Sequence, residues 1–117
     1  MEKLNKSTDI KRVKQEGKAF LHPLVVLIIH PNSTIPFRYC VSTGRAIGNA
    51  VKRNRAKRIL KEALYNLNQN YSFNAHTVGW DILIIARQPI IHSKTTFLIP
   101  VLKSFFIRSG LIQNKQD

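Results

Sequence analysis

The sequence predicts an α+β fold: a two-layer sandwich in which one small central sheet is covered mainly on one face by helices. Two observations predict it. Apolar runs of strand length alternate with stretches in which apolar residues recur at the spacing of a helix. These stretches follow the order αββαβα without an internal repeat, and a mixed order of this kind is typical of helices packed against a small sheet.

Length and composition predict a single domain over residues 1–117. A chain of 117 residues has the usual size of one domain. Hydrophobic residues make up 44% of it, which is enough to bury a core. We expect the tail, from about residue 110 to 117, to be flexible.

The first helix is expected over residues 8–15. Ser7 has the side chain of an N-cap, and Gly17 would end the helix. Ile10 and Val13 lie three apart, so both would face a core.

Two strands are expected next, at residues 24–29 and 37–43. Aliphatic and β-branched residues fill the first run, and a stretch with two prolines and an asparagine separates the two. We therefore expect the strands to pair as a hairpin, with Cys40 as a small core residue of the second.

A long helix is expected over residues 49–69, after a loop bracketed by Gly44 and Gly48. Its apolar residues stand at 56, 59, 60, 63, 64 and 67. That spacing places them on one face of a helix.

A polar linker at 70–79 leads to the last strand and the last helix. The apolar run at 80–86 does not alternate, which is typical of a strand covered on both faces. Asp81 would cap or start it. The final helix is expected at 94–108 and ends at Gly110, and Pro100 must either lie in its first turn or kink it.

The charge of the chain predicts a polyanionic partner. Lys and Arg number 19 against 6 Asp and Glu, for a net charge of +13. No carboxylate occurs from residue 17 to 61, although nine Lys and Arg fall there. Because a solvated helix would usually alternate the signs of its charges, the counter-charge is expected to come from outside the protein, and nucleic acid is the leading candidate.

The cations concentrate on the long helix. Arg53, Lys57 and Lys61 form an i,i+4 line beside its apolar face. Arg can hold phosphate through paired donors, Lys adds point charge, and an Asn amide can reach a base edge or a 2′-hydroxyl. The candidate RNA-binding residues are Arg45, Asn49, Lys52, Arg53, Asn54, Arg55, Lys57, Arg58 and Lys61.

The sequence offers no catalytic residues and no metal site of its own. The glycine loop lacks the GxxxxGK[ST] pattern of a nucleotide-binding loop. The four histidines are scattered, the single cysteine cannot form an intramolecular disulfide, and so few carboxylates could hardly hold catalytic Mg²⁺. We expect no secretory signal and no membrane partner, because no run approaches the roughly 18 apolar residues of a span.

One stretch is specific enough to suggest a family. Residues 47–63 read IGNAVKRNRAKRILKEA. This run resembles the RNR motif of the bacterial ribonuclease P protein component, GNAVxRNRxKRxxRE, and departs from it only at Lys61, where Arg is usual. The segment DILIIAR at 81–87 resembles another family segment, DIVVIAR, and Arg38 fits the family's second strand.

The resemblance implies a function and partners. It implies a βαβ crossover of left-handed sense, and an RNA-binding subunit of a ribozyme endonuclease that removes 5′ leaders from precursor tRNA. The partners would be ribonuclease P RNA and precursor tRNA, with no obligate protein partner. Mg²⁺ would be held mainly by the RNA subunit, and the location would be the bacterial cytoplasm or an organelle of bacterial descent.

The resemblance also implies a cleft for the single-stranded leader, between the sheet and the first helix. Its residues here would be Ile10, Lys14, Val26 and Ile28. Family members often place aromatics in this cleft, so leader binding here should depend more on charge and less on stacking. Ala46 also replaces one lysine of a pair usual before the Gly-Asn.

Two other functions remain open from the sequence. The first is a non-catalytic RNA chaperone or ribosome-associated RNA-binding protein. The second is a basic DNA-binding domain, which the absence of helix-turn-helix spacing disfavours.

Overall fold

The computed structural model describes residues 2–32, 37–71 and 79–112. Within them the chain forms a five-stranded sheet in the order β1-β4-β5-β3-β2, with three α-helices and two short 3₁₀ helices. The strands are β1 (Glu2–Lys3), β2 (Lys18–Leu21), β3 (Val25–Asn32), β4 (Phe37–Thr43) and β5 (Gly79–Ala86). The helices are α1 (Ser7–Glu16), η1 (Arg45–Ile47), α2 (Ala50–Asn70), η2 (Gln88–His92) and α3 (Thr95–Ser109).

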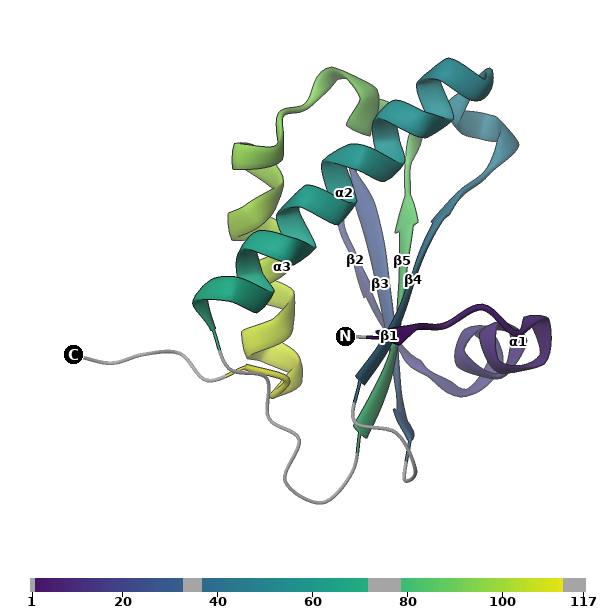
Figure 1. Ribbon diagram of the computed structural model, residues 1–117, viewed down its shortest axis with the longest axis vertical. Helices are drawn as coiled ribbons and strands as arrows, with labels where there is room; N and C mark the ends of the chain where they lie inside the picture. Colours follow the sequence, from purple (N-terminus) through teal and green to yellow (C-terminus); the bar gives the residue numbers. More distant parts are fainter. Residues whose placement is uncertain (1, 33–36, 72–78, 113–117) are drawn as a thin grey trace.

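The helices cover the two faces of the sheet unequally. Helices α2 and α3 lie together on one face, and α1 alone lies on the other (Figure 1). The predicted α+β class, with helices mainly on one face, is confirmed.

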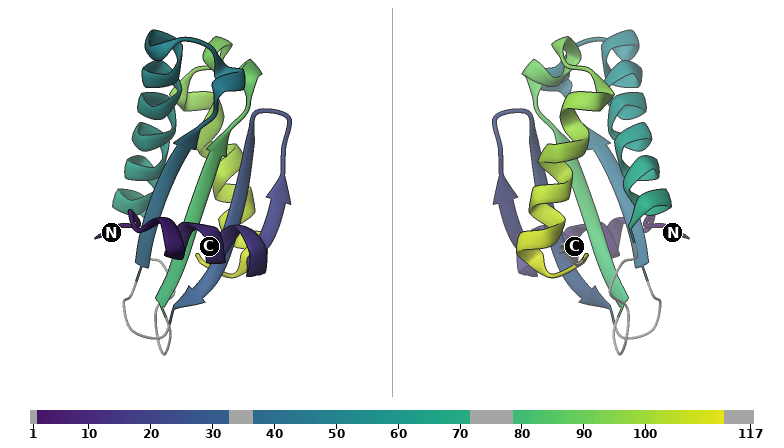
Figure 2. Two further views of the ribbon diagram at one scale, coloured as in Figure 1. Left: turned by 90° about the vertical axis from the view of Figure 1, so that its right-hand side faces the viewer. Right: turned by 90° about the vertical axis from the view of Figure 1, so that its left-hand side faces the viewer.

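The predicted hairpin between β3 and β4 is wrong. Strand β5 lies between them, antiparallel to β3 and parallel to β4. The chain therefore leaves β4, runs back through α2 and returns in β5. Seen from the helix side, β5 lies to the left of the upward-pointing β4 (Figure 2, right), so the crossover is left-handed, as the resemblance implied.

The sequence prediction missed two strands. Strand β2 pairs antiparallel with β3, and the turn between them is closed by His22 and Val25, whose backbone groups bond in both directions. Only Phe20 of its four residues is buried, so its apolar pattern is weak. Strand β1 has two residues and pairs with β4. The order αββαβα thus gains a strand before α1 and another after it.

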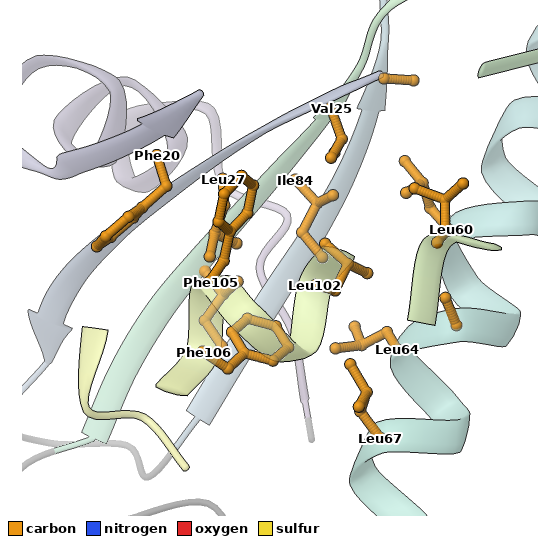
Figure 3. Packing of buried hydrophobic residues seen from close by; sticks show 14 of the residues in the cluster. Phe20, Val25, Leu27, Leu60, Leu64, Leu67, Ile84, Leu102, Phe105 and Phe106 are labelled. Atoms are coloured by element: carbon orange, nitrogen blue, oxygen red, sulfur yellow. The ribbon is translucent and has the colours of Figure 1, made fainter. Parts of the chain in front are cut away.

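The main core lies between the sheet and the pair α2 and α3. Leu27 and Ile84 from the sheet meet Leu60 and Leu64 from α2, and Phe106 from α3 (Figure 3). The face of α2 that the apolar spacing predicted is the buried one.

The end of the chain departs from the expected flexible tail. Gly110 adopts a left-handed conformation (φ 81°) and ends α3, as predicted. Leu111 and Ile112 then fold back into the main core, where they are 0% and 2% exposed. The rest of the predicted tail, residues 113–117, lies outside the described residues, as does most of the predicted linker.

A second, smaller core holds α1 on the opposite face. Leu4 and Val13 pack there against Ile28 and Leu83 of the sheet. Gly17 follows α1 directly, and a Cβ on it would stand 2.7 Å from the Ile28 side chain. Gly17 is the C-cap of α1, and glycine suits this position because the backbone passes close to β3, whereas its φ of −78° is ordinary.

Two details of the helices correct the predictions. Ser7 is the first residue of α1, and Lys6, which precedes it, provides no side-chain cap. Pro100 lies inside α3, beyond its first turn. Because Pro100 is exposed, the backbone bond that it cannot make lies on the solvent side of the helix.

Candidate RNA interface

The start of α2 carries positive charge that no acidic residue in its first turn neutralises. Gly48 has a φ of 126°, a conformation that favours glycine, and turns the chain from η1 into the helix. The Asn49 side chain then accepts a hydrogen bond from the Lys52 backbone N–H at 3.0 Å, which makes Asn49 the N-cap. The first turn contains no acidic residue, so the positive end of the helix dipole is not neutralised from within.

The three cations of the i,i+4 line, Arg53, Lys57 and Lys61, differ in exposure. Arg53 is half-buried, and its Nη1 donates to the Gly48 carbonyl oxygen at 2.7 Å. It therefore holds the turn before α2. The other eight predicted RNA-binding residues are exposed.

Lys57 and Lys61 face the edge of the sheet where the short strand β1 pairs with β4. With Lys3 and Cys40 they line a hollow of about 130 Å³. The hollow places two helix cations beside the sheet face that α1 partly covers.

Lys52 and Arg55 lie on the other flank of α2, facing η2. They line a hollow of about 710 Å³ together with Asn49 and His92. A neighbouring hollow of about 480 Å³ adds Arg58 and Lys94. The only acid that lines either of these hollows is Glu62, which accepts a hydrogen bond from the Thr95 hydroxyl at 2.9 Å.

Of the predicted leader residues, Ile10 and Lys14 lie on α1 and Val26 and Ile28 lie on β3, and the four are not equally accessible. Ile10 and Val26 are half-buried and Lys14 is exposed, whereas Ile28 is only 9% exposed beneath α1. Helix α1 crosses the sheet obliquely and leaves the part of this face near the start of α2 without a helix (Figure 2, left). Val26 and its partner Ile85 lie on that open part.

Cys40 lies on the same face, half-buried on β4. Burial raises the pKa of its thiol, while the charges of Lys14, Lys57 and Lys61 act in the opposite direction. These lysines come from α1 and α2, so both helices direct positive charge toward this face of the sheet.

An ion-pair cluster joins α1 to the sheet, and sequence reasoning missed it. Arg38 donates two hydrogen bonds to Asp81, from Nε to Oδ1 at 2.8 Å and from Nη2 to Oδ2 at 2.7 Å. Its Nη1 donates a third to Oδ2 of Asp9 on α1 at 3.2 Å. Asp81 is 3% exposed and also accepts from Asn32. It is thus a buried partner of Arg38 within β5, and the prediction that it caps the strand is wrong. The hydrogen bond to Asp81 raises the pKa of Arg38, so the guanidinium stays charged.

The described residues bring together no donor set for a metal ion. No group of three His, Cys, Asp or Glu side chains converges among them. Two of the described carboxylates, those of Asp9 and Asp81, meet at Arg38 and are both bound by its guanidinium. Among the described helices, none is long and apolar enough to cross a membrane.

Comparisons with known proteins agree on one family. The family model described as Ribonuclease P matches residues 1–109. A "Ribonuclease P protein component" from Clostridioides difficile (strain 630) is 36% identical over 84 residues, which cover 72% of this chain and 70% of that protein. One from Caldanaerobacter subterraneus subsp. tengcongensis is 30% identical over 114 residues, covering 97% and 94%.

Solved structures show the same fold. The RNase P protein of Staphylococcus aureus superposes with a TM-score of 0.78 at 24% identity, covering 97% of this chain and 99% of that one. The RNase P protein of Thermotoga maritima gives a TM-score of 0.76 at 21% identity, covering 92% and 97%.

Proposed function

Because this chain belongs to the bacterial ribonuclease P protein component family, and is thus a protein subunit of the endoribonuclease that processes precursor tRNA 5′ ends, we propose which RNA each of its surfaces binds. The η2 flank of α2 docks on ribonuclease P RNA. The β4 flank of α2 and the open sheet face beside α1 receive the 5′ leader of precursor tRNA.

One observation carries the proposal: the cations of α2 stand on two flanks, and the only acid that lines a hollow beside these cations is Glu62, which is bonded to Thr95. Lys52 and Arg55 border the wider hollow, which suits the backbone of a folded RNA. Lys57 and Lys61 face the sheet edge, where a single strand could pass between α2 and α1. Arg45, Asn54 and Arg58 are exposed and extend the binding surface around the start and the outer side of the helix.

The leader surface is aliphatic and cationic. Val26, Ile85 and Ile10 supply apolar contact, and Lys14 supplies charge at its border. Without aromatic side chains among these residues, leader binding on the sheet depends mainly on charge.

Mg²⁺ belongs to the RNA in this proposal. The described side chains do not suit a catalytic metal, because the converging carboxylates are tied to Arg38. The protein assists instead by placing cations beside phosphates. This lowers the repulsion between substrate and ribozyme and reduces the Mg²⁺ concentration that cleavage needs.

Reconstitution with a bacterial ribonuclease P RNA tests the proposal. Precursor tRNA should be cleaved faster at low Mg²⁺ with the protein than without it, and the advantage should shrink at high Mg²⁺. A protein that binds RNA but gives no acceleration at any Mg²⁺ concentration would contradict the proposal and favour an RNA chaperone.

A further inference from the structure

A second hollow on the β4 flank of α2 has aromatic walls. It measures about 260 Å³ and is lined by Tyr39, Lys61, Leu64, Tyr65 and Asn68. None of the roles described above uses Tyr65 or Asn68.

Tyr65 exposes its aromatic ring on the surface of α2. It is 66% exposed, whereas the next residue toward the N-terminus, Leu64, is 4% exposed in the main core. A large exposed aromatic gains little from packing, and aromatic rings beside cations are typical of surfaces that stack nucleic-acid bases.

Tyr39 gives the hollow a rigid wall. Its neighbours Arg38 and Cys40 face α1, so strand alternation turns the Tyr39 side chain toward α2, where it packs against the main core. Its carbonyl accepts the Leu4 N–H at 2.6 Å, which fixes this part of β4 between β5 and the N-terminal segment.

The chemistry of the hollow matches a single unpaired base. Leu64 forms an apolar floor, the two tyrosines offer rings for stacking, and the Asn68 amide can donate and accept at a base edge. Pockets for drug-sized ligands measure roughly 300–1,000 Å³, so a hollow of about 260 Å³ suits a smaller flat group.

The hollow also continues the proposed path of the leader. It shares Tyr39 and Lys61 with the hollow that contains Lys57 and Cys40, and Cys40 lies on the sheet face beside α1. Lys57, Lys61 and Tyr65 are four residues apart, so each step advances about 6 Å along the helix. Two phosphate-binding groups thus lead from the sheet edge to the aromatic hollow.

We propose that this hollow binds one unpaired base of the precursor tRNA leader, beyond the part of the leader that lies on the sheet. The assignment rests on the proposed function. It gives the protein a stacking site that the aliphatic residues near α1 do not provide.

The test uses the reconstituted holoenzyme and precursor tRNAs that differ only in leader length. With the wild-type protein, the affinity of the holoenzyme for precursor tRNA should rise when the leader becomes long enough to reach the hollow. Tyr65→Ala should remove this rise and lower the affinity for the long-leader substrate roughly 5- to 150-fold, since stacking is worth roughly 1–3 kcal/mol per base. Tyr65→Phe keeps a ring and should bind within about twofold of wild type. Gln69→Ala, exposed one turn further along α2, is the matched control.

An abasic residue moved stepwise through the leader locates the base. One position should weaken wild-type binding, and the same position should have no effect with Tyr65→Ala. The assignment is overturned if Tyr65→Ala retains the leader increment, or if its main effect is on ribonuclease P RNA binding. Failure of the proposed function is a different result, because the wild-type protein itself would then not accelerate cleavage.

Discussion

At the scale of single residues, Arg38 connects the two layers that form the leader surface. Its guanidinium spans Asp81 in the centre of the sheet and Asp9 on α1, and its side chain is only 16% exposed. Charges this far from water stabilise a structure only while all partners are present. Arg38 therefore fixes the orientation of α1 over the sheet together with the smaller core around Val13.

Arg38→Met should destabilise the protein by about 3 kcal/mol, because it leaves the buried Asp81 carboxylate without its charged partner. Urea unfolding followed by circular dichroism measures the change. Arg12→Ala is the control: Arg12 also pairs with Asp9, but it is 52% exposed and should cost less than about 0.5 kcal/mol. Equal effects of the two variants would contradict the role given to Arg38.

Cys40 should react slowly with iodoacetamide in the folded protein. Burial raises the pKa of its thiol, so less thiolate is present at pH 8 than in the unfolded chain. We expect alkylation to be slower in the folded protein than in urea, measured by mass spectrometry. Lys57→Ala with Lys61→Ala should slow it further, because these two charges lower the pKa. Faster reaction of the folded protein would contradict the burial of this thiol.

Sequence patterns predict exposure at this scale better than they predict pairing. Eight of the nine cations and amides predicted to bind RNA are exposed. Six of these lie on α2, where they are exposed because a helix turns residues away from its apolar face in a regular way. The bond of Arg38 to Asp81 joins residues 43 apart in the chain. It depends on the parallel pairing of β4 with β5, which no local pattern encodes.

At the scale of elements, the same limit explains the wrong hairpin. Strands β3 and β4 are neighbours in sequence with turn residues between them, so the local signal favours pairing. The actual hairpin joins β2 to β3, and β2 has one buried side chain. The long helix was easier to predict, because six buried residues repeat over its length.

Gly17→Ala tests how closely α1 lies against β3. A Cβ there would stand 2.5 Å from the Val13 carbonyl oxygen and 2.7 Å from that of Ile29, and neither backbone atom can move cheaply. We expect the free energy of unfolding, measured in urea, to fall by about 1–3 kcal/mol. This loss is larger than the stabilisation that alanine provides by lowering the entropy of the unfolded chain. Gly44→Ala is the matched control, since a Cβ there meets nothing within 4 Å. A neutral Gly17→Ala would mean that α1 can shift away from the strand.

Substitutions on the two flanks of α2 should weaken the binding of different RNAs. Lys52→Ala with Arg55→Ala should weaken binding of ribonuclease P RNA and lower its log–log salt slope by about 0.9 for each phosphate that the variant no longer neutralises. Lys57→Ala with Lys61→Ala should act mainly on precursor tRNA, and less on mature tRNA without a leader. Fluorescence anisotropy at several salt concentrations measures both. The same loss for both RNAs with both double variants would mean that the flanks share one ligand.

At the scale of the whole molecule, the net charge of +13 has two opposite consequences. Cations without matching acids repel one another in the free protein, and this repulsion opposes folding. In the complex the same cations neutralise phosphates, which releases counterions and favours binding. Added salt screens both interactions, so it should stabilise the protein while weakening the complex.

Raising KCl from about 50 to 200 mM should therefore increase the Tm of the free protein while it reduces RNA affinity. If screening relieves about 1 kcal/mol of repulsion, the Tm rises by roughly 4–8 °C. Over the same range, neutralisation of roughly 6–10 phosphates predicts an affinity loss of roughly 10³–10⁵-fold. Lys52→Gln with Arg55→Gln, two exposed cations on α2, should make both quantities less sensitive to salt. A Tm that falls with added KCl would show that attraction within the protein, centred on Arg38, outweighs the repulsion among its other cations.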